Sequence, residues 1–182
     1  AALALSGRRV LCLDCDIGLR NLDISLGLSD RALMDFSDVA LVRCPLARGA
    51  VDHPDVKGLS LLTAPMSLSP SLTIDKVRAM LDTARGQYDY ILIDGMPKMG
   101  TAMINVMICC DSLIIPVQSE TLAVEEMAEF LRAFHRIKSH ANARLEIEGI
   151  LITMDNERTR VSKRVKAQLQ QALGEKVRIF TN

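Results

Sequence analysis

The sequence predicts an α/β fold: a doubly wound, mostly parallel sheet with helices on both faces. Two observations lead to this fold class. Apolar runs of strand length alternate with helical patterns along the whole chain. These runs are continuously apolar, which is typical of strands that are covered on both faces of a sheet. The 182 residues, of which 49% are hydrophobic, suffice for one domain with a sizeable core.

The elements are expected to alternate after AALALSG, which reads as the end of a helix with Gly7 at its C-terminal stop. Residues 43–58, with Pro45, Gly49, Pro54 and Gly58, are expected to form a loop. In chain order the expected elements are strand Val10–Leu13, helix Arg31–Val42, strand Leu59–Leu62, helix Ile74–Arg85, strand Tyr90–Ile93, helix Thr101–Cys110, strand Ser112–Val117, helix Leu122–His140, strand Ile147–Thr153, helix Val161–Leu173 and strand Val177–Phe180.

The composition limits the possible surfaces and locations. Lys+Arg and Asp+Glu are both 22, so any surface for nucleic acid or membrane must be local. Asp or Pro interrupts the apolar stretches well short of a transmembrane span. Five cysteines without disulfide-like spacing, together with no visible signal peptide, favour a cytoplasmic location.

Carboxylates follow two of the expected strands where each strand ends. Asp14 ends VLCLD and Asp94 ends YILID, and the turn GMPKMG follows the second. Ligands of such folds bind beyond the carboxyl ends of the strands. Four apolar residues followed by Asp form the Walker B pattern, in which the Asp holds Mg²⁺, usually through water. The alternative is that these aspartates are turn residues.

Residues 14–23 read DCDIGLRNLD and place more charge after the first strand. Unpaired carboxylates are costly to bury, so a metal ion, another cation or water should meet them. In the alternative interpretation, Asp14 and Asp16 cap a turn while Asp23 pairs with Arg20 at i, i+3.

Three ordered stretches resemble the ParA/MinD family of deviant Walker ATPases, over nearly the whole chain. ALALSGRRVLCLDCDIGLRNLDISLGL is similar to the MinD branch. YDYILIDGMPKMGTAMINVMICCDSLIIPVQSETLAVEEM and LEIEGILITMDNERTRVSKRV are similar to the ParA/Soj branch. The resemblance implies a P-loop NTPase fold, ATP and Mg²⁺ as cofactors, a nucleotide-sandwich homodimer, and a regulatory partner of the ParB or MinE type.

The resemblance also implies roles for individual residues. Asp16 would help to place the attacking water, Asp14 would support the Mg²⁺ site, and Asp94 would be the Walker B metal residue. Residues 95–100 would form the second switch, which senses the γ-phosphate. The residues implied at the nucleotide and switches are Asp14, Gly95, Pro97, Gly100 and Asn156, and those implied at the dimer interface are Arg20, Asn21 and Asp23.

A basic cluster lies at residues 158–166, RTRVSKRVK. Its arginines and lysines could neutralise DNA phosphates without reading sequence, and the resemblance implies that Arg158 contacts DNA. The alternative is a solvated helix face. The residues expected to bind DNA are Arg158, Arg160, Lys163 and Arg164.

The defining loop of the family is not found in the 182 residues, because nothing matches G-x-x-x-x-G-K-[ST]. That loop supplies backbone N–H groups and a lysine to the phosphates. The chain also starts without Met, within a helix that lacks an N-cap. We therefore expect a single domain, residues 1–182, that is truncated at both ends and lacks its first strand and P-loop. Alone, it should bind ATP poorly and not hydrolyse it.

The expected function is that of a partitioning or positioning ATPase, which acts in chromosome or plasmid segregation or in septum placement. The first alternative is a non-hydrolysing relative that serves as a DNA- or protein-binding scaffold. A flavodoxin-like domain is the second alternative, but it does not explain a second Asp-ended strand followed by G-x-P-x-x-G. Membrane or nucleoid association stays open.

Cys12 and Cys15 match the C-x-x-C pattern of redox pairs and zinc sites. On a strand, however, residues i and i+3 point to opposite faces. The two thiols should therefore not converge, and we expect neither a redox nor a zinc site here.

Overall fold

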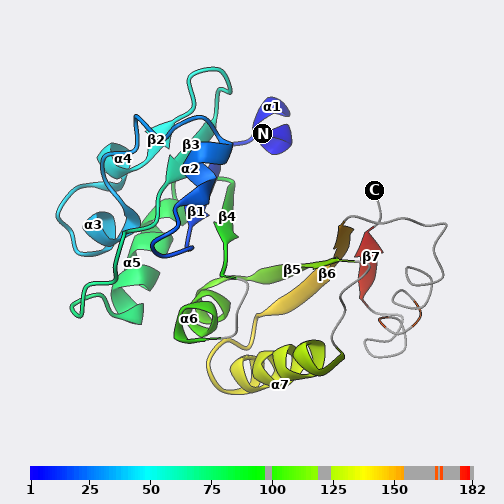
Figure 1. The fold of residues 1–182 in the computed structure, drawn as a ribbon. Coiled ribbons are helices and arrows are strands. Elements are labelled where there is room, and N and C mark those ends of the chain that lie inside the picture. Colours follow the sequence, from blue (N-terminus) through cyan, green and yellow to red (C-terminus); the bar gives the residue numbers. More distant parts are fainter. Residues whose placement is uncertain (97–99, 119–123, 154–166, 168, 170–176, 181–182) are drawn as a thin grey trace. The chain divides into compact units, whose positions relative to one another are not determined.

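The computed structural model describes residues 1–96, 100–118, 124–153, 167, 169 and 177–180 (Figure 1). The chain divides into two compact units, Ala1–Cys109 and Cys110–Asn182. Each unit contains its own mostly parallel sheet with helices, which confirms the α/β class. The expected single domain stays a prediction.

The first unit is built on a four-stranded sheet in the order β2-β3-β1-β4. The strands β1 (Val10–Asp14), β3 (Leu59–Leu62) and β4 (Tyr90–Asp94) run parallel. The two-residue strand β2 (Val51–Asp52) pairs antiparallel with β3. The helices of this unit are α1 (Ala2–Leu5), α2 (Asn21–Ser25), α3 (Phe36–Ala40), α4 (Leu46–Gly49), α5 (Ile74–Arg85) and α6 (Thr101–Cys109).

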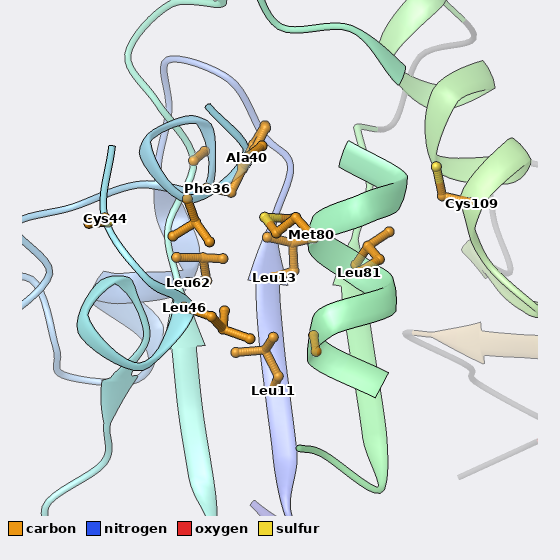
Figure 2. Close-up of a cluster of buried hydrophobic side chains, with 13 residues drawn as sticks. Leu11, Leu13, Phe36, Ala40, Cys44, Leu46, Leu62, Met80, Leu81 and Cys109 are labelled. Atoms are coloured by element: carbon orange, nitrogen blue, oxygen red, sulfur yellow. The ribbon is translucent and has the colours of Figure 1, made fainter. Parts of the chain in front are cut away.

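The central strand β1 is buried along its whole length because both faces of the sheet are covered. Leu11 and Leu13 pack in the cluster that contains Phe36 of α3 and Met80 of α5 (Figure 2). The alternate residues of β1 belong to a second cluster, which includes Leu28 and the buried residue of α1. Each fully buried leucine contributes roughly 1.5–3 kcal/mol. This two-sided burial explains why VLCL lacks polar alternation.

The second unit contains the parallel strands β5 (Ser112–Gln118), β6 (Glu146–Thr153) and β7 (Arg178–Phe180), in that order. Helix α7 (Val124–His140) contributes Met127 to a core that also holds Ile150 and Ile152. Lys138, in the last turn of α7, donates to the carbonyl of Leu145 at 2.8 Å and thereby fixes the connection to β6.

All six expected strands are present, with bounds that differ by at most one residue. The expected helix Arg31–Val42 is wrong, because only Phe36–Ala40 is an α-helix. Asp35 is extended and forms a capping box with Asp38, so α3 has to begin after it. Helices α2 and α4 were not expected. The expected helix Val161–Leu173 lies outside the described residues except for Ala167 and Leu169.

Candidate functional site

Asp14 and Asp94 lie side by side at one edge of the first sheet. They are register partners at the carboxyl ends of the neighbouring parallel strands β1 and β4. The amide of Cys15 donates to the carbonyl of Asp94 at 2.9 Å and extends the pairing one step beyond β1. The carboxyl ends of two strands therefore bring their acidic residues to one place, where ligands of open α/β sheets bind.

Asp14 is fully buried and holds the turn that follows β1. Its Oδ1 accepts from the amide of Asp16 at 2.8 Å, and its Oδ2 accepts from the amide of Leu22 at 3.2 Å. Leu22 lies in the first turn of α2, whose leading amides have no partner within the helix. Asp14 thus caps a turn, as the alternative interpretation allowed. Its role as a direct metal ligand stays a prediction, and in this conformation its side chain has no exposed surface.

Asp94 carries the exposed carboxylate of the site. The pKa of Asp94 is raised, first by partial burial of its carboxyl group and then by the negative charges of Asp14 and Asp16. These three carboxylates form one acidic locus in which negative charge is incompletely balanced. A divalent cation would relieve that repulsion, so the residues fit one.

The protein supplies few ligands for such a cation. Among the residues that the structure describes, no group of three or more His, Cys, Asp or Glu side chains is arranged to hold a metal ion. Mg²⁺ commonly keeps several waters and is bound by one or two carboxylates together with substrate phosphates. Asp94, as the exposed carboxylate, fits that mode of binding better than an all-protein metal centre.

The segment after β4 leads directly into α6. A Cβ atom added to Gly95 would lie 3.3 Å from Sδ of Met103, so a larger residue here would require the Met103 side chain to shift slightly. The carbonyl of Gly100 accepts from the amide of Ile104 at 3.0 Å and begins α6. Pro97 lies outside the described residues, as does Asn156. The switch role of this segment stays a prediction.

The two thiols of the C-x-x-C pattern lie on opposite faces of the sheet, as expected. Cys12 belongs to the cluster around Leu28, whereas Cys15 packs against the cluster around α5. Burial raises the pKa of Cys15 to about 12, and the nearby Asp14 and Asp94 act in the same direction. Cys15 packs against the core, and its burial disfavours the thiolate that redox or metal chemistry requires. The expected absence of a redox or zinc site stays a prediction.

Arg20 and Asp23 form an ion pair with an Nη2–Oδ2 distance of 3.4 Å. This is the i, i+3 pairing that the sequence spacing allowed. Asp23 is 5% exposed, whereas Asn21 is exposed. The assignment of Arg20, Asn21 and Asp23 to a dimer interface stays a prediction, and the side chain of Asp23 is buried within this chain.

Sequence reasoning missed Thr63 at the carboxyl end of β3. Thr63 is 1% exposed, accepts from Nη2 of Arg20 at 3.4 Å and donates to the carbonyl of Met34 at 3.2 Å. Thr63 directly follows the strand LSLL, and this position after a strand was the available signal. Through Arg20, the end of β3 contacts the segment that follows β1.

The predicted DNA-binding residues lie outside the described part of the chain: Arg158, Arg160, Lys163 and Arg164. Within the described part, no helix is long and apolar enough to cross a membrane.

Comparison with known proteins connects this site to a family. The family model described as AAA domain matches residues 1–147. The sporulation initiation inhibitor protein Soj of Bacillus subtilis is 31% identical over 97% of this chain and 73% of its own length. The chain belongs to the ParA/MinD/Soj family of ATPases. Another relative in this family, the chromosome partitioning protein ParA of Caulobacter vibrioides, is 30% identical over 97% of this chain and 69% of its own length.

Solved structures agree with the family assignment. The cobyrinic acid a,c-diamide synthase from Mycobacterium smegmatis, with bound ATP analog and magnesium, has a TM-score of 0.80 at 26% identity and covers 93% of this chain and 72% of its own. The MinC:MinD cell division protein complex of Aquifex aeolicus has a TM-score of 0.66 at 28% identity, with 83% and 58% covered. The family match begins at residue 1, and none of these comparisons supports the expected loss of a Walker A loop.

Proposed function

We propose that this chain carries the acidic side of a magnesium–ATP site in a partitioning or positioning ATPase. The observation that carries the proposal is the register pairing of Asp14 with Asp94, with Asp16 in the turn that Asp14 holds. Membership in the ParA/MinD/Soj family supports the same reading.

Each carboxylate has a distinct task in this proposal. Bound magnesium–ATP supplies the phosphoryl group and the positive charge that balances it. Asp94, which is exposed at the end of β4, would hold the cation. Asp16 would accept a hydrogen bond from the attacking water and orient it, and Asp14 keeps Asp16 in place through the Asp16 amide. Catalysis then rests on positioning and electrostatics, without a covalent enzyme intermediate.

Membership in the ParA/MinD/Soj family also supports a proposal for the oligomeric state and the binding partners. A nucleotide-dependent homodimer would join two copies near residues 20–23. A regulatory protein of the ParB or MinE type would act on that dimer, just as a related MinD occurs in a complex with MinC. Non-specific DNA binding through Arg158, Arg160, Lys163 and Arg164 remains part of the proposal.

The test is ATP turnover by the product of the complete reading frame that contains this chain. Asp16→Ala should lower kcat by about 10²-fold or more, because the attacking water loses its acceptor. Asp30→Ala is the matched control, since Asp30 is an exposed aspartate beyond α2. Equal turnover in the parent and in Asp16→Ala would remove Asp16 from the mechanism.

A non-hydrolysing scaffold is the second candidate. It would bind DNA or protein partners through the basic cluster at residues 158–166. This candidate predicts that magnesium–ATP causes no thermal shift and no turnover in the complete product, whereas the ATPase predicts both.

A further inference from the structure

Arg20 connects the segment that carries Asp16 to other parts of the first unit, in addition to the hydrogen bonds that Asp14 accepts. The amide of Arg20 donates to the carbonyl of Asp16 at 3.3 Å, so the two residues share one turn. From the same residue, Nη2 reaches Oδ2 of Asp23 at 3.4 Å, the carbonyl of Ala32 at 3.1 Å and Oγ1 of Thr63 at 3.4 Å. We refer to these three side-chain contacts as the Arg20 clamp.

The Arg20 clamp leaves hydrogen-bonding capacity unused. Within the described part of the chain, Nε of Arg20 and Oδ1 of Asp23 are the buried side-chain atoms that lack a hydrogen-bond partner. Nη2 carries two hydrogens but faces three acceptors. The Arg20–Asp23 pair is therefore not bidentate, although Nε and Oδ1 are both buried beside the contact that it makes.

The backbone of Arg20 is also in an uncommon conformation. Arg20 has φ 52° and ψ 54°, in the left-handed region that non-glycine residues rarely adopt. Such a conformation persists only where surrounding contacts enforce it. Here the enforcing contacts include the Arg20 clamp.

Helix α2 is held by a few apolar contacts and by polar ones. Leu22 and Leu26 are partly buried against the cluster around Leu28, Asp23 is the one buried residue of this five-residue helix, and Ile24 is 67% exposed. The polar contacts are the hydrogen bond from the Leu22 amide to Asp14 and the ion pair of Arg20 with Asp23. Segments with few buried apolar contacts open locally at low cost, without unfolding the core.

We propose that Arg20 is a positioning residue for Asp16 and that the Arg20 clamp is a releasable device. When it is closed, the left-handed Arg20 holds residues 15–25 against Ala32 and Thr63. When it opens, residues 15–25 move as one piece while the sheet stays folded. The inference rests on the proposed function, because the position of Asp16 matters to catalysis only if Asp16 orients water.

Hydrogen–deuterium exchange on the full chain, measured by mass spectrometry, tests the clamp without nucleotide. Arg20→Lys keeps the charge, but its side chain is shorter, so the ammonium group should not reach the three acceptors that Nη2 of Arg20 contacts. We expect amides of residues 15–25 to exchange about tenfold faster, while those of β1 and β3 stay within about twofold of the parent. The matched control is Arg43→Lys, which alters an exposed Arg43–Asp38 pair at 3.3 Å and should change neither region.

Two results would overturn the clamp. One is unchanged exchange in residues 15–25, and the other is an equal rise in β1 and β3, which would make Arg20 a general stability residue. If Arg20→Lys does not fold, Thr63→Val is the alternative test, because it removes one acceptor of the clamp. We expect about threefold faster exchange that is confined to residues 15–25. The absence of faster exchange in residues 15–25 would refute the proposal.

A double variant separates the clamp from simple charge balance. Arg20→Met with Asp23→Leu removes both charges, and replacement of a buried ion pair by apolar residues is often neutral for global stability. We expect fast exchange in residues 15–25 with a core as protected as in the parent. Retained protection of that segment would show that the polar contacts do not hold it.

Turnover links the clamp to Asp16. In the complete product used for the Asp16→Ala assay, Arg20→Lys should lower kcat about tenfold with little change in KM. An unchanged kcat beside faster local exchange would refute the positioning role of Arg20. Turnover of Asp16→Ala tests the proposed function, whereas hydrogen–deuterium exchange tests the Arg20 clamp, so failure of one can be distinguished from failure of the other.

Discussion

Asp14 satisfies two backbone amides from a position without solvent contact, and this explains how a carboxylate can end a fully buried strand. Charge-assisted hydrogen bonds to backbone N–H groups compensate for the loss of water. The same two bonds determine where Asp16 lies and where α2 begins. Asp14 therefore acts on the site through the turn that it holds.

Asp14→Asn tests this role. The asparagine amide group presents N–H donors where Leu22 or Asp16 needs an acceptor, so one buried amide loses its partner. We expect the free energy of unfolding to fall by about 1–3 kcal/mol in urea denaturation. Asp30→Asn, at an exposed position, should change it by less than about 0.5 kcal/mol. A loss as small as that of the control would mean that the two bonds contribute little.

Asp89 and Arg9 form a second acidic–basic contact, at the opposite ends of β1 and β4. Asp89 accepts from the Arg9 amide at 2.8 Å and from Nη2 of Arg9 at 2.9 Å. The Arg9 hydrogen bonds lower the pKa of Asp89 from 3.8 to about 2. A carboxyl group with a lowered folded-state pKa stabilises the fold above its unfolded pKa, and this contribution is lost as pH falls through the folded value.

The stability contribution of Asp89 should therefore be complete above about pH 4 and disappear between about pH 4 and pH 2. In Asp89→Asn the urea midpoint should depend less on pH within that window than in the parent protein. The comparison requires urea unfolding at several pH values from 2 to 6. Parallel pH profiles for the parent and the variant would contradict the assigned ion pair.

At the scale of elements, glycine conformations restrict the connections to the sheet. Gly58, directly before β3, has φ +85°, and an added Cβ would lie 2.9 Å from the carbonyl oxygen of Arg8. Gly27, after α2, has φ +67° but has open space around the added atom. Both positions require a positive φ, but only at Gly58 would an added Cβ atom collide with a backbone atom.

Alanine at these two glycines should therefore have unequal effects. Gly27→Ala should cost about 1–2 kcal/mol, the penalty of the left-handed conformation. Gly58→Ala should cost at least about 1 kcal/mol more, because the Arg8 backbone has to shift as well. Thermal and urea unfolding of both variants measure the difference. Equal losses would mean that the Arg8 contact is relieved without cost.

The elements also show how far sequence patterns extend. The continuous apolar runs predicted the bounds of β1, β3 and β4 closely. Burial on both faces explains the runs of β1 and β3, whereas β4 is partly exposed along its length although its sequence is equally apolar. The helical pattern at residues 31–42 misled because tertiary contacts place Asp35 in an extended conformation. The D-x-x-D spacing of Asp35 and Asp38 was the available signal for the later start of α3.

Part of the candidate site was also predictable from apolar runs in the sequence. Asp14 and Asp94 each end an apolar run, and parallel strands bring such ends together. Strand order is not encoded locally, so the position of β3 beside β1 could not be read, nor could the contact between Arg20 and Thr63. The left-handed Arg20 has no sequence signature, because only glycine and asparagine favour that conformation.

For the whole molecule, the proposed magnesium–ATP site depends on the paired aspartates Asp14 and Asp94 in the first unit and on membership in the ParA/MinD/Soj family. β4 offers an internal comparison, since it has an aspartate at either end. Asp89 precedes the strand and pairs with Arg9, whereas Asp94 ends it beside Asp14. Only the second aspartate should meet a metal–nucleotide ligand.

The most direct measurement is the affinity of the complete reading-frame product for Mn²⁺–ATP, followed by electron paramagnetic resonance of the bound ion. Asp94→Asn should weaken binding by about tenfold or more, because a carboxylate that faces the hydrated cation is lost. Asp89→Asn should bind as the parent does. Equal affinities in the parent and Asp94→Asn would contradict the central claim that the carboxyl ends of β1 and β4 form the nucleotide site.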